Sequence, residues 1–323
     1  MNVNPNASEP SEAKFTDLAM RLRSLNEGDV AVLDSIAAGA AAIPVLRELL
    51  FERDAAGIFE PRTKAVQALA ALNAFGVLKE FVMKWQPASD PVERLGDEAV
   101  LSAAARALAT TGDEEAFVIL FGVAREHPAP GVIEALGRCK RPESIPALIA
   151  ALTDDCAGAA AEQGFRSMGQ EAVPALVDAA LNVVTGASGR ETPSSIRRRR
   201  RAFSLLFELG ATREVWDRVR ESIKDQDDEI AALACRIGVS AADQAQVREC
   251  GGRLMELLRR VAWPVRQEIE DCLIDNYDFA NELVVRALRE VSEIKSLEIE
   301  RARFIRSLRK VISKATARNG AWR

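Results

Sequence analysis

One short pattern recurs along the 323-residue chain and constrains its fold more than any other feature. An aliphatic residue followed by proline begins an apolar run at Ile43-Pro44, at Ile145-Pro146 and at Val173-Pro174. Proline suits the first turn of a helix, because the N–H that it lacks would have no intrahelical partner there. Apolar residues follow at helical spacing, so each copy predicts a helix with one buried face.

A second apolar helix is expected after each of these heads, and weaker heads without proline begin near Val77, Phe117 and Val215. The predicted second helices lie near residues 61–72, 97–109, 130–138, 156–168, 194–209, 227–238 and 264–275. A helix pair of this size cannot bury its own apolar face, so it must stack on its neighbours. The pattern therefore predicts an all-α repeat protein.

The repeats resemble the HEAT-repeat family, particularly the short bacterial HEAT-like repeats of the phycobilin-lyase type. The best matches are residues 143–169 and 171–209, where the Ile/Val-Pro-Ala-Leu head and the alanine-rich second helix stand in family order. The acidic turn Asp154-Asp155 also fits the family pattern. The resemblance implies a right-handed α-solenoid of about seven helix pairs with capping helices. It also implies a concave surface, lined by the second helices, that holds a macromolecule.

The ends of the chain differ from its middle. Residues 1–14 are polar and are expected to be disordered, while residues 15–39 are predicted to form N-terminal capping helices. The repeat solenoid is assigned to residues 40–275. Residues 276–323 are assigned to a basic C-terminal cap or a partner-binding helix.

The C-terminal segment allows two interpretations. After Pro264 neither glycine nor proline occurs before Gly320, and apolar residues recur at helical steps. One interpretation is an eighth helix pair that closes the solenoid, with a turn near residues 293–297. The other is one long helix with an apolar seam for self-association through residues 284–315.

Composition excludes several kinds of chemistry. The single histidine, His127, excludes any site built from two histidines. The five cysteines are widely spaced, without a Cys-x-x-Cys pair, so they predict reduced thiols in a cytoplasmic protein. No glycine-rich phosphate loop and no metal-ligand cluster occurs in the sequence. We therefore expect no catalytic residues, no cofactor and no metal site. Separately, we expect the side chains of Trp85 and Trp263 to fill gaps between repeats.

The most unusual local feature is a run of five arginines: Arg197, Arg198, Arg199, Arg200 and Arg201. It lies in the first turns of a predicted helix, where cations oppose the helix dipole and each other at i, i+4. Five successive residues surround a helix, so they cannot all face one ligand. Either they pair with Asp227, Asp228 and Glu229 across a repeat boundary, or they contact an anionic partner on the inner face.

The basic C-terminus is the second candidate binding region. Residues 301–323 contain eight Lys or Arg and no acid, although the whole chain has a net charge of −5. As a helix, this segment would have an apolar stripe through Phe304 and Leu308. The candidate binding residues beside that stripe are Arg303, Arg306, Arg309, Lys310 and Lys314. Such a helix docks on the solenoid, binds an acidic protein surface, or contacts nucleic acid or an anionic membrane surface.

The functional hypothesis is a non-enzymatic scaffold or adaptor that binds another protein along its concave face. The first alternative is a nucleic-acid-associated protein that uses Arg197–Arg201 and the basic C-terminal helix. The second, which the phycobilin-lyase resemblance implies, is a lyase-like or chaperone-like factor that acts on a client protein. No segment reaches the roughly 18 uninterrupted apolar residues that a transmembrane helix needs.

Overall fold

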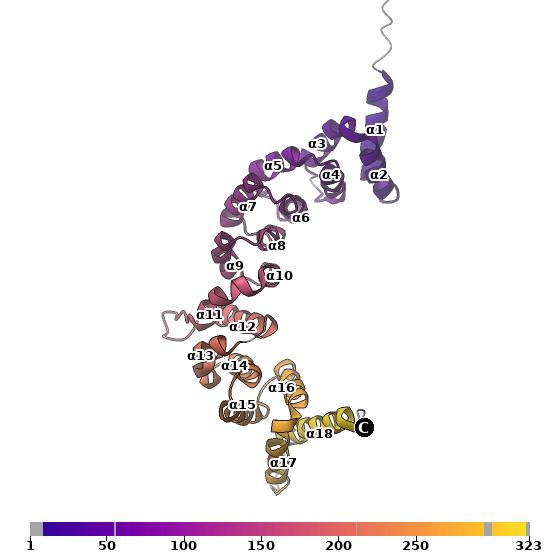
Figure 1. Ribbon diagram of the computed structural model, residues 1–323. Coiled ribbons are helices and arrows are strands. Elements are labelled where there is room, and N and C mark those ends of the chain that lie inside the picture. The colour runs from indigo at the N-terminus through magenta and orange to yellow at the C-terminus, as the bar shows by residue number, and fades with distance from the viewer. Residues whose placement is uncertain (1–8, 55, 211, 294–298, 321–323) are drawn as a thin grey trace, which may run out of the picture. The chain divides into compact units, whose positions relative to one another are not determined.

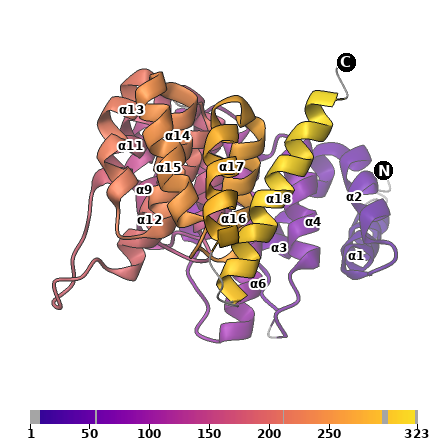
Figure 2. The same cartoon turned by 90° about the horizontal axis from the view of Figure 1, so that it is seen from below.

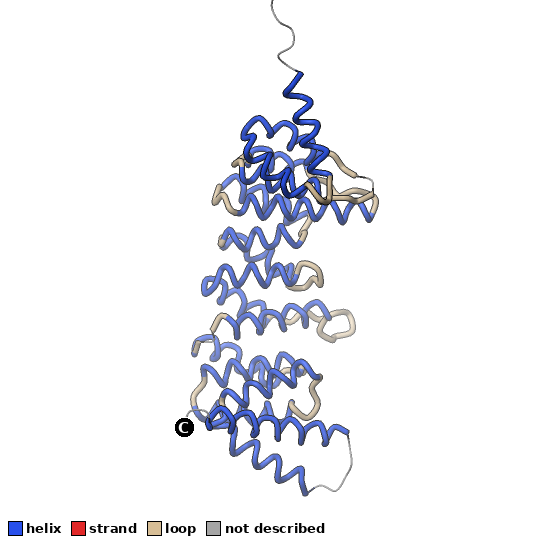
Figure 3. The backbone as a smooth tube through the Cα atoms, turned by 90° about the vertical axis from the view of Figure 1, so that its right-hand side faces the viewer, coloured by secondary structure: helices blue, strands red, loops and turns tan. Residues whose placement is uncertain are grey.

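The computed structural model describes residues 9–320 except 55, 211 and 294–298, and within them it contains helices and loops but no β-strand (Figure 3). The helices are α1 (Glu9–Arg23), α2 (Gly28–Ala38), η1 (Gly39–Ala42), α3 (Ile43–Phe51), α4 (Glu60–Ala71), α5 (Phe75–Lys84), α6 (Pro91–Ala109), α7 (Glu114–Glu126), α8 (Pro130–Cys139), η2 (Pro142–Ser144), α9 (Ile145–Ala151), α10 (Gly158–Met168), η3 (Gly169–Ala172), α11 (Val173–Leu181), α12 (Pro193–Glu208), α13 (Arg213–Val219), η4 (Arg220–Lys224), α14 (Asp228–Ala241), α15 (Gln244–Leu257), α16 (Trp263–Asp275), α17 (Tyr277–Glu293) and α18 (Ile299–Gly320). The predicted all-α solenoid is confirmed.

The chain divides into two compact units, unit 1 (Met1–Met168) and unit 2 (Gly169–Arg323). In unit 1 the described helices form the pairs α1/α2, α3/α4, α5/α6, α7/α8 and α9/α10. Each second helix packs on the next, from α2 through α4, α6 and α8 to α10. Figure 1 shows these second helices in one layer and the first helices α3, α5, α7 and α9 in the other.

Unit 2 repeats the same plan. Its described pairs are α11/α12, α13/α14, α15/α16 and α17/α18, and the second helices α12, α14, α16 and α18 contact one another in that order. All seven predicted second helices are present, from α4 to α16, and each begins within about six residues of its predicted start. The proposed domain boundaries at residues 14, 39 and 275 stay predictions.

The three proline-containing heads begin α3, α9 and α11. A short 3₁₀ turn precedes each helix, and the turns before α3 and α11 start at Gly39 and Gly169, whose φ angles are 68° and 66°. Glycine adopts this left-handed conformation without the steric cost that a Cβ would add. The leucine two residues after each proline is fully buried: Leu46, Leu148 and Leu176. The turn thus fixes the angle at which the head leucine enters the core.

Helices α8 and α10 of unit 1 approach each other through glycine. A Cβ atom placed on Gly137 would lie 2.1 Å from the Cα of Gly164, a distance that no pair of atoms tolerates. A Cβ on Gly131 would likewise lie 2.2 Å from the Cβ of Ser102 on α6. At these points α8 and α10 therefore pack backbone against backbone, and α8 packs on the small Ser102 of α6.

Replacing Gly137 with alanine is expected to destabilise unit 1 by about 1–3 kcal/mol or more, because the new methyl group meets backbone atoms that cannot rotate away. Gly122→Ala on α7 is the matched control, since its Cβ would meet nothing within 4 Å. The control should be neutral or stabilising by up to about 1 kcal/mol, from helix propensity alone. Urea unfolding of both variants measures the difference, and equal stability of the two would contradict the close contact.

The C-terminal segment forms a helix pair. Helices α17 and α18 contact each other, and α18 also packs on α16 (Figure 2). The expected turn near 293–297 falls almost entirely on residues outside the described part of the chain. Phe304, Leu308, Val311 and Ala315 on α18 are buried, so the predicted apolar stripe faces the neighbouring helices. The described residues of this segment therefore form two contacting helices, and their role as a cap stays a prediction.

Two elements differ from expectation. Residues 1–8 of the expected disordered tail lie outside the described part of the chain, and helix α1 begins at Glu9 inside the expected range 1–14. In addition, no first helix was predicted at α15, whose Gly251-Gly252 pair is unusual inside a helix. A Cβ on Gly251 would lie 2.8 Å from Phe279 and Leu283 of α17, so glycine is needed for this contact.

One described stretch, Gly28–Phe51, is long and apolar enough to cross a membrane by length and composition alone. It comprises α2, η1 and α3, and the chain bends within it at Gly39. Core helices of repeat proteins meet the same two criteria, so the stretch is weak evidence for a membrane span.

Candidate functional site

The arginine run begins α12 as the sequence predicted. Pro193 occupies the first turn, and the hydroxyl of Thr192 caps the helix by accepting a hydrogen bond of 3.2 Å from the N–H of Ser195. The arginines then diverge around the helix, so they separate into groups with different surroundings.

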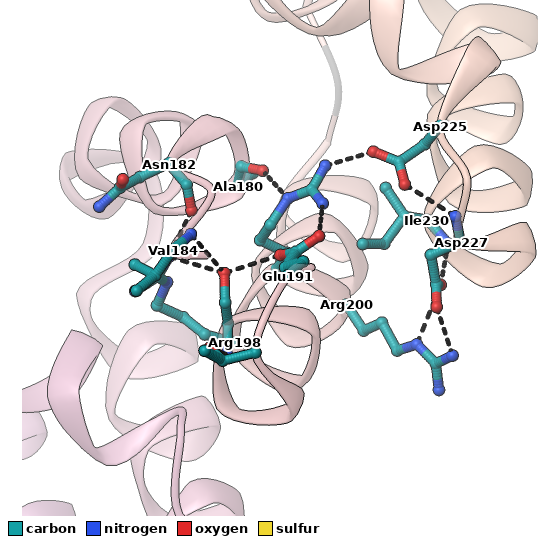
Figure 4. A network of polar contacts seen from close by, with 12 residues as sticks. Ala180, Asn182, Val184, Glu191, Arg198, Arg200, Asp225, Asp227 and Ile230 are labelled. Atoms are coloured by element: carbon teal, nitrogen blue, oxygen red, sulfur yellow. Dashed lines mark hydrogen bonds and ion pairs between the residues drawn. The ribbon is translucent and has the colours of Figure 1, made fainter. Parts of the chain in front are cut away.

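Arg198 and Arg199 point into unit 2 and are 9% and 3% exposed. Arg199 donates from Nε to the carbonyl of Ala180 at 2.9 Å, and its guanidinium forms ion pairs with Glu191, at 2.7 Å, and with Asp225 (Figure 4). Arg198 donates to the carbonyl of Asn182. Both side chains therefore join the end of α11 to the loop that precedes α12.

The loop between α11 and α12 is held by further hydrogen bonds. Ser195 Oγ donates to Glu191 at 2.7 Å and accepts from the N–H of Val184 at 3.0 Å. The backbone closes the same loop through a bond of 2.8 Å from the N–H of Gly186 to the carbonyl of Arg190. Arg199 and its partners thus belong to a buried polar network that orders this loop.

Arg200 links α12 to the next helix pair. It pairs with Asp227 at 2.6 Å and with Glu229 at 2.7 Å, and Asp227 also caps α14 by accepting from the N–H of Ile230 at 3.1 Å. Asp228 pairs instead with Arg260, at 2.6 Å. The acidic neighbours expected from the sequence therefore brace Arg200, apart from Asp228.

The surroundings of Asp227 and Glu229 shift their pKa values in opposite directions. Burial acts to raise the pKa of Asp227, but hydrogen bonds from Arg200 and from the N–H of Ile230 outweigh it and hold the pKa below its ordinary value of 3.8. Asp227 therefore stabilises the fold above pH 3.8, and that contribution is lost as the pH falls through the lowered pKa. For Glu229, burial prevails over the nearby Arg200 and raises the pKa.

The remaining two arginines of the run, Arg197 and Arg201, lie at i, i+4 on the exposed side of α12. They line a surface cavity of about 430 Å³ together with Arg200, Pro193, Ile196, Asp227 and Glu229. The cavity combines cationic side chains and two carboxylates with the apolar side chains of Pro193 and Ile196. A segment that carries a carboxylate beside an apolar residue matches these two features.

The candidate binding residues of the basic C-terminus also have different surroundings. Lys310 pairs with Glu270 of α16, whereas Arg303 and Arg306 line a second cavity with Trp263 and Arg266. Arg309 and Lys314 are exposed and lie outside that cavity.

The sequence reading missed Trp263 and Arg266 as cavity residues. Trp85 is buried, as expected, but Trp263 is 73% exposed, so its expected role as a gap filler is wrong. Its position at the first residue of α16 turns it away from the core. Among the residues that the structure describes, no group of three or more His, Cys, Asp or Glu side chains is placed to hold a metal ion.

Residues 131–154, which span most of α8, all of η2 and α9, match the family model of the PBS lyase HEAT-like repeat. The chain contains a HEAT-like repeat. The resemblance drawn from the sequence is therefore confirmed for residues 131–154, which overlap the first expected best match, 143–169, in residues 143–154. The second, 171–209, stays a prediction.

No curated protein matches the chain. One solved structure, from work on a conserved phosphorylation switch that controls the interaction between cadherin and beta-catenin, aligns with 97% of this chain and 74% of its own. The sequence identity is 13% and the TM-score is 0.30. The stacked helix pairs of the two units have the organisation of an α-helical repeat protein, and residues 131–154 of unit 1 are HEAT-like.

Proposed function

We propose that this protein is a non-enzymatic HEAT-like scaffold that binds a protein partner on its second-helix face, the exposed surface of α4, α6, α8 and α10 in unit 1 and of α12, α14 and α16 in unit 2. The observation that carries the proposal is the cavity on α12. Arg197 and Arg201 line it beside Pro193 and Ile196, so one site offers both charge and apolar contact.

The different surroundings of the five arginines support this proposal. Arg198 and Arg199 are buried in the loop network, and Arg200 pairs with Asp227 at the start of α14. Arg197 and Arg201 face the cavity on the exposed side of the same helix. A partner segment with an acidic residue would place its carboxylate between them, where charge-assisted hydrogen bonds are strong.

Unit 1 offers apolar contacts of the kind that protein partners cover. Val92 and Leu95 on α6 are 56% and 70% exposed, one helical turn apart. Exposed apolar side chains that adjoin one another are typical of interaction surfaces. Unit 1 therefore offers apolar contacts on its own surface, and unit 2 offers mixed polar and apolar contacts on its own.

Photo-crosslinking tests the proposal on the full chain. A photoreactive residue at position 204, on α12, is expected to form an adduct with one discrete protein in nuclease-treated extract of the native cells. The same residue at position 217, on α13, samples the first-helix side and should form no such adduct. The proposal would be contradicted by an adduct that nuclease treatment abolishes, or by equal labelling from positions 204 and 217.

A charge reversal then identifies the contact. Arg197→Glu with Arg201→Glu should reduce the position-204 adduct by about tenfold or more, because two cationic contacts become repulsive. Arg218→Glu with Arg220→Glu is the matched control, since these exposed side chains of the same unit lie outside the cavity. The control should retain the adduct.

A further inference from the structure

Unit 2 contains a second cavity, which the proposed scaffold function does not use. It has a volume of about 390 Å³ and lies between the first turns of α16 and the middle of α18. Trp263, Arg266 and Glu270 line it from α16, and Arg303, Arg306 and Lys310 line it from α18. Its volume falls at the lower end of the range of small-molecule sites.

The lining is strongly cationic. Its one carboxylate, Glu270, is 4% exposed and is already paired with Lys310. Arg303 and Arg306 lie at i, i+3, which places both on one face of α18, and neither has an ion-pair partner among the described residues. Among the side chains that the structure describes, no acid therefore forms an ion pair with either guanidinium group.

Arg266 adds a donor whose hydrogen-bonding capacity is unused. Its Nη2 donates to the carbonyl of Val261 at 2.9 Å, but its Nε is buried without a hydrogen-bond partner. Arg266 therefore adds a third guanidinium group to the lining of the cavity. The start of α16 also favours an anion, because no side chain caps its first N–H groups and the N-terminal end of a helix attracts anions.

Trp263 supplies the apolar part of the cavity. Its side chain is 73% exposed although it adjoins three arginines, and a large flat ring is costly to leave in water. Planar bases stack on such rings, and an arginine pair binds phosphate through two parallel hydrogen bonds for each guanidinium. An anionic group joined to a planar ring satisfies both halves of the site.

We propose that this cavity binds a nucleoside phosphate, with its phosphate at Arg303 and Arg306 and its base stacked on Trp263. The volume suits a single nucleotide, and the cationic groups line one cavity of limited size. The site is separate from the α12 cavity, and the two share no residue.

Calorimetric titration of the full chain with AMP tests the proposal, with adenosine and ribose 5-phosphate as the two halves of the ligand. AMP should bind, and each half should bind at least tenfold more weakly. Arg303→Glu with Arg306→Glu should weaken AMP binding by a hundredfold or abolish it. Arg309→Glu with Lys314→Glu makes the same change of charge on the same helix outside the cavity, and it should alter the AMP affinity by less than threefold.

Substitution of Trp263 distinguishes the contribution of base stacking from that of phosphate binding. Trp263→Ala should weaken AMP about tenfold and leave the affinity for ribose 5-phosphate unchanged. Equal losses in the two charge reversals would show a general electrostatic effect and overturn the proposal. Binding of a single-stranded oligonucleotide without binding of AMP would overturn it in favour of a nucleic-acid surface. The α12 charge reversal leaves this cavity intact, so failure of either proposal does not affect the other.

Discussion

Arg199→Met is expected to lower the free energy of unfolding by about 3–5 kcal/mol, because it leaves two carboxylates without their cation in a buried site. The methionine fills similar space, so the loss reports charge and hydrogen bonding rather than a cavity. Urea unfolding at pH 7 measures it. The carbonyl of Ala180 also loses its donor, which adds to the effect.

Two variants control this result. Arg218→Met removes an exposed arginine that pairs with Asp178 in the same unit, and it should cost no more than about 1 kcal/mol. Arg199→Lys keeps the charge but cannot reach three partners with a planar fork, so it should fall between the two. If Arg199→Met were as stable as Arg218→Met, the buried network would contribute no stability.

Leu148→Ala is expected to destabilise unit 1 by about 2–5 kcal/mol, because Leu148 is fully buried and its removal leaves a cavity. Leu33→Ala, at a leucine of α2 that is 66% exposed, should change stability by less than about 0.5 kcal/mol. In a repeat protein each pair stabilises its neighbours, so hydrogen exchange should speed up in the adjacent pairs as well as in α9.

A double-mutant cycle sharpens this test. A Cβ placed on Gly164 would lie 3.0 Å from the Cδ2 of Leu148, so the two positions compete for the same space. Gly164→Ala should therefore cost less stability in the Leu148→Ala background than in the native chain. Strict additivity of the two changes would contradict the contact between α9 and α10.

The helix pairs could be predicted from the sequence because their signals are local. A proline in the first turn and apolar residues at helical spacing fix a helix and its buried face without reference to distant segments. The burial of Leu148 and Leu176 agrees with that pattern. Helix α15 was not predicted, because the pair Gly251-Gly252 is unfavourable inside a helix. Its glycine is explained only by α17, about 30 residues further along the chain.

The candidate sites were predicted only in part. The residue types of the arginine run and of α18 indicated anion contacts, but the direction of each side chain depends on how the helix is turned against its neighbours. The sequence does not distinguish Arg199 from the four arginines beside it. Its burial in the structure gives it a structural role. Trp263 and Arg266 join Arg303 and Arg306 only because α16 packs on α18, a contact that no local pattern records.

The glycine contacts of α6, α8 and α10 also bear on how unit 1 opens. Side chains that interdigitate can rearrange one rotamer at a time, whereas touching backbones separate only when a whole helix moves. Loss of one of these helices would expose the main chain of the next along its contact line. We therefore expect amide protons in the three helices to exchange with one common opening free energy, as a single foldon, while the α1/α2 pair at the end of the unit frays at a lower one.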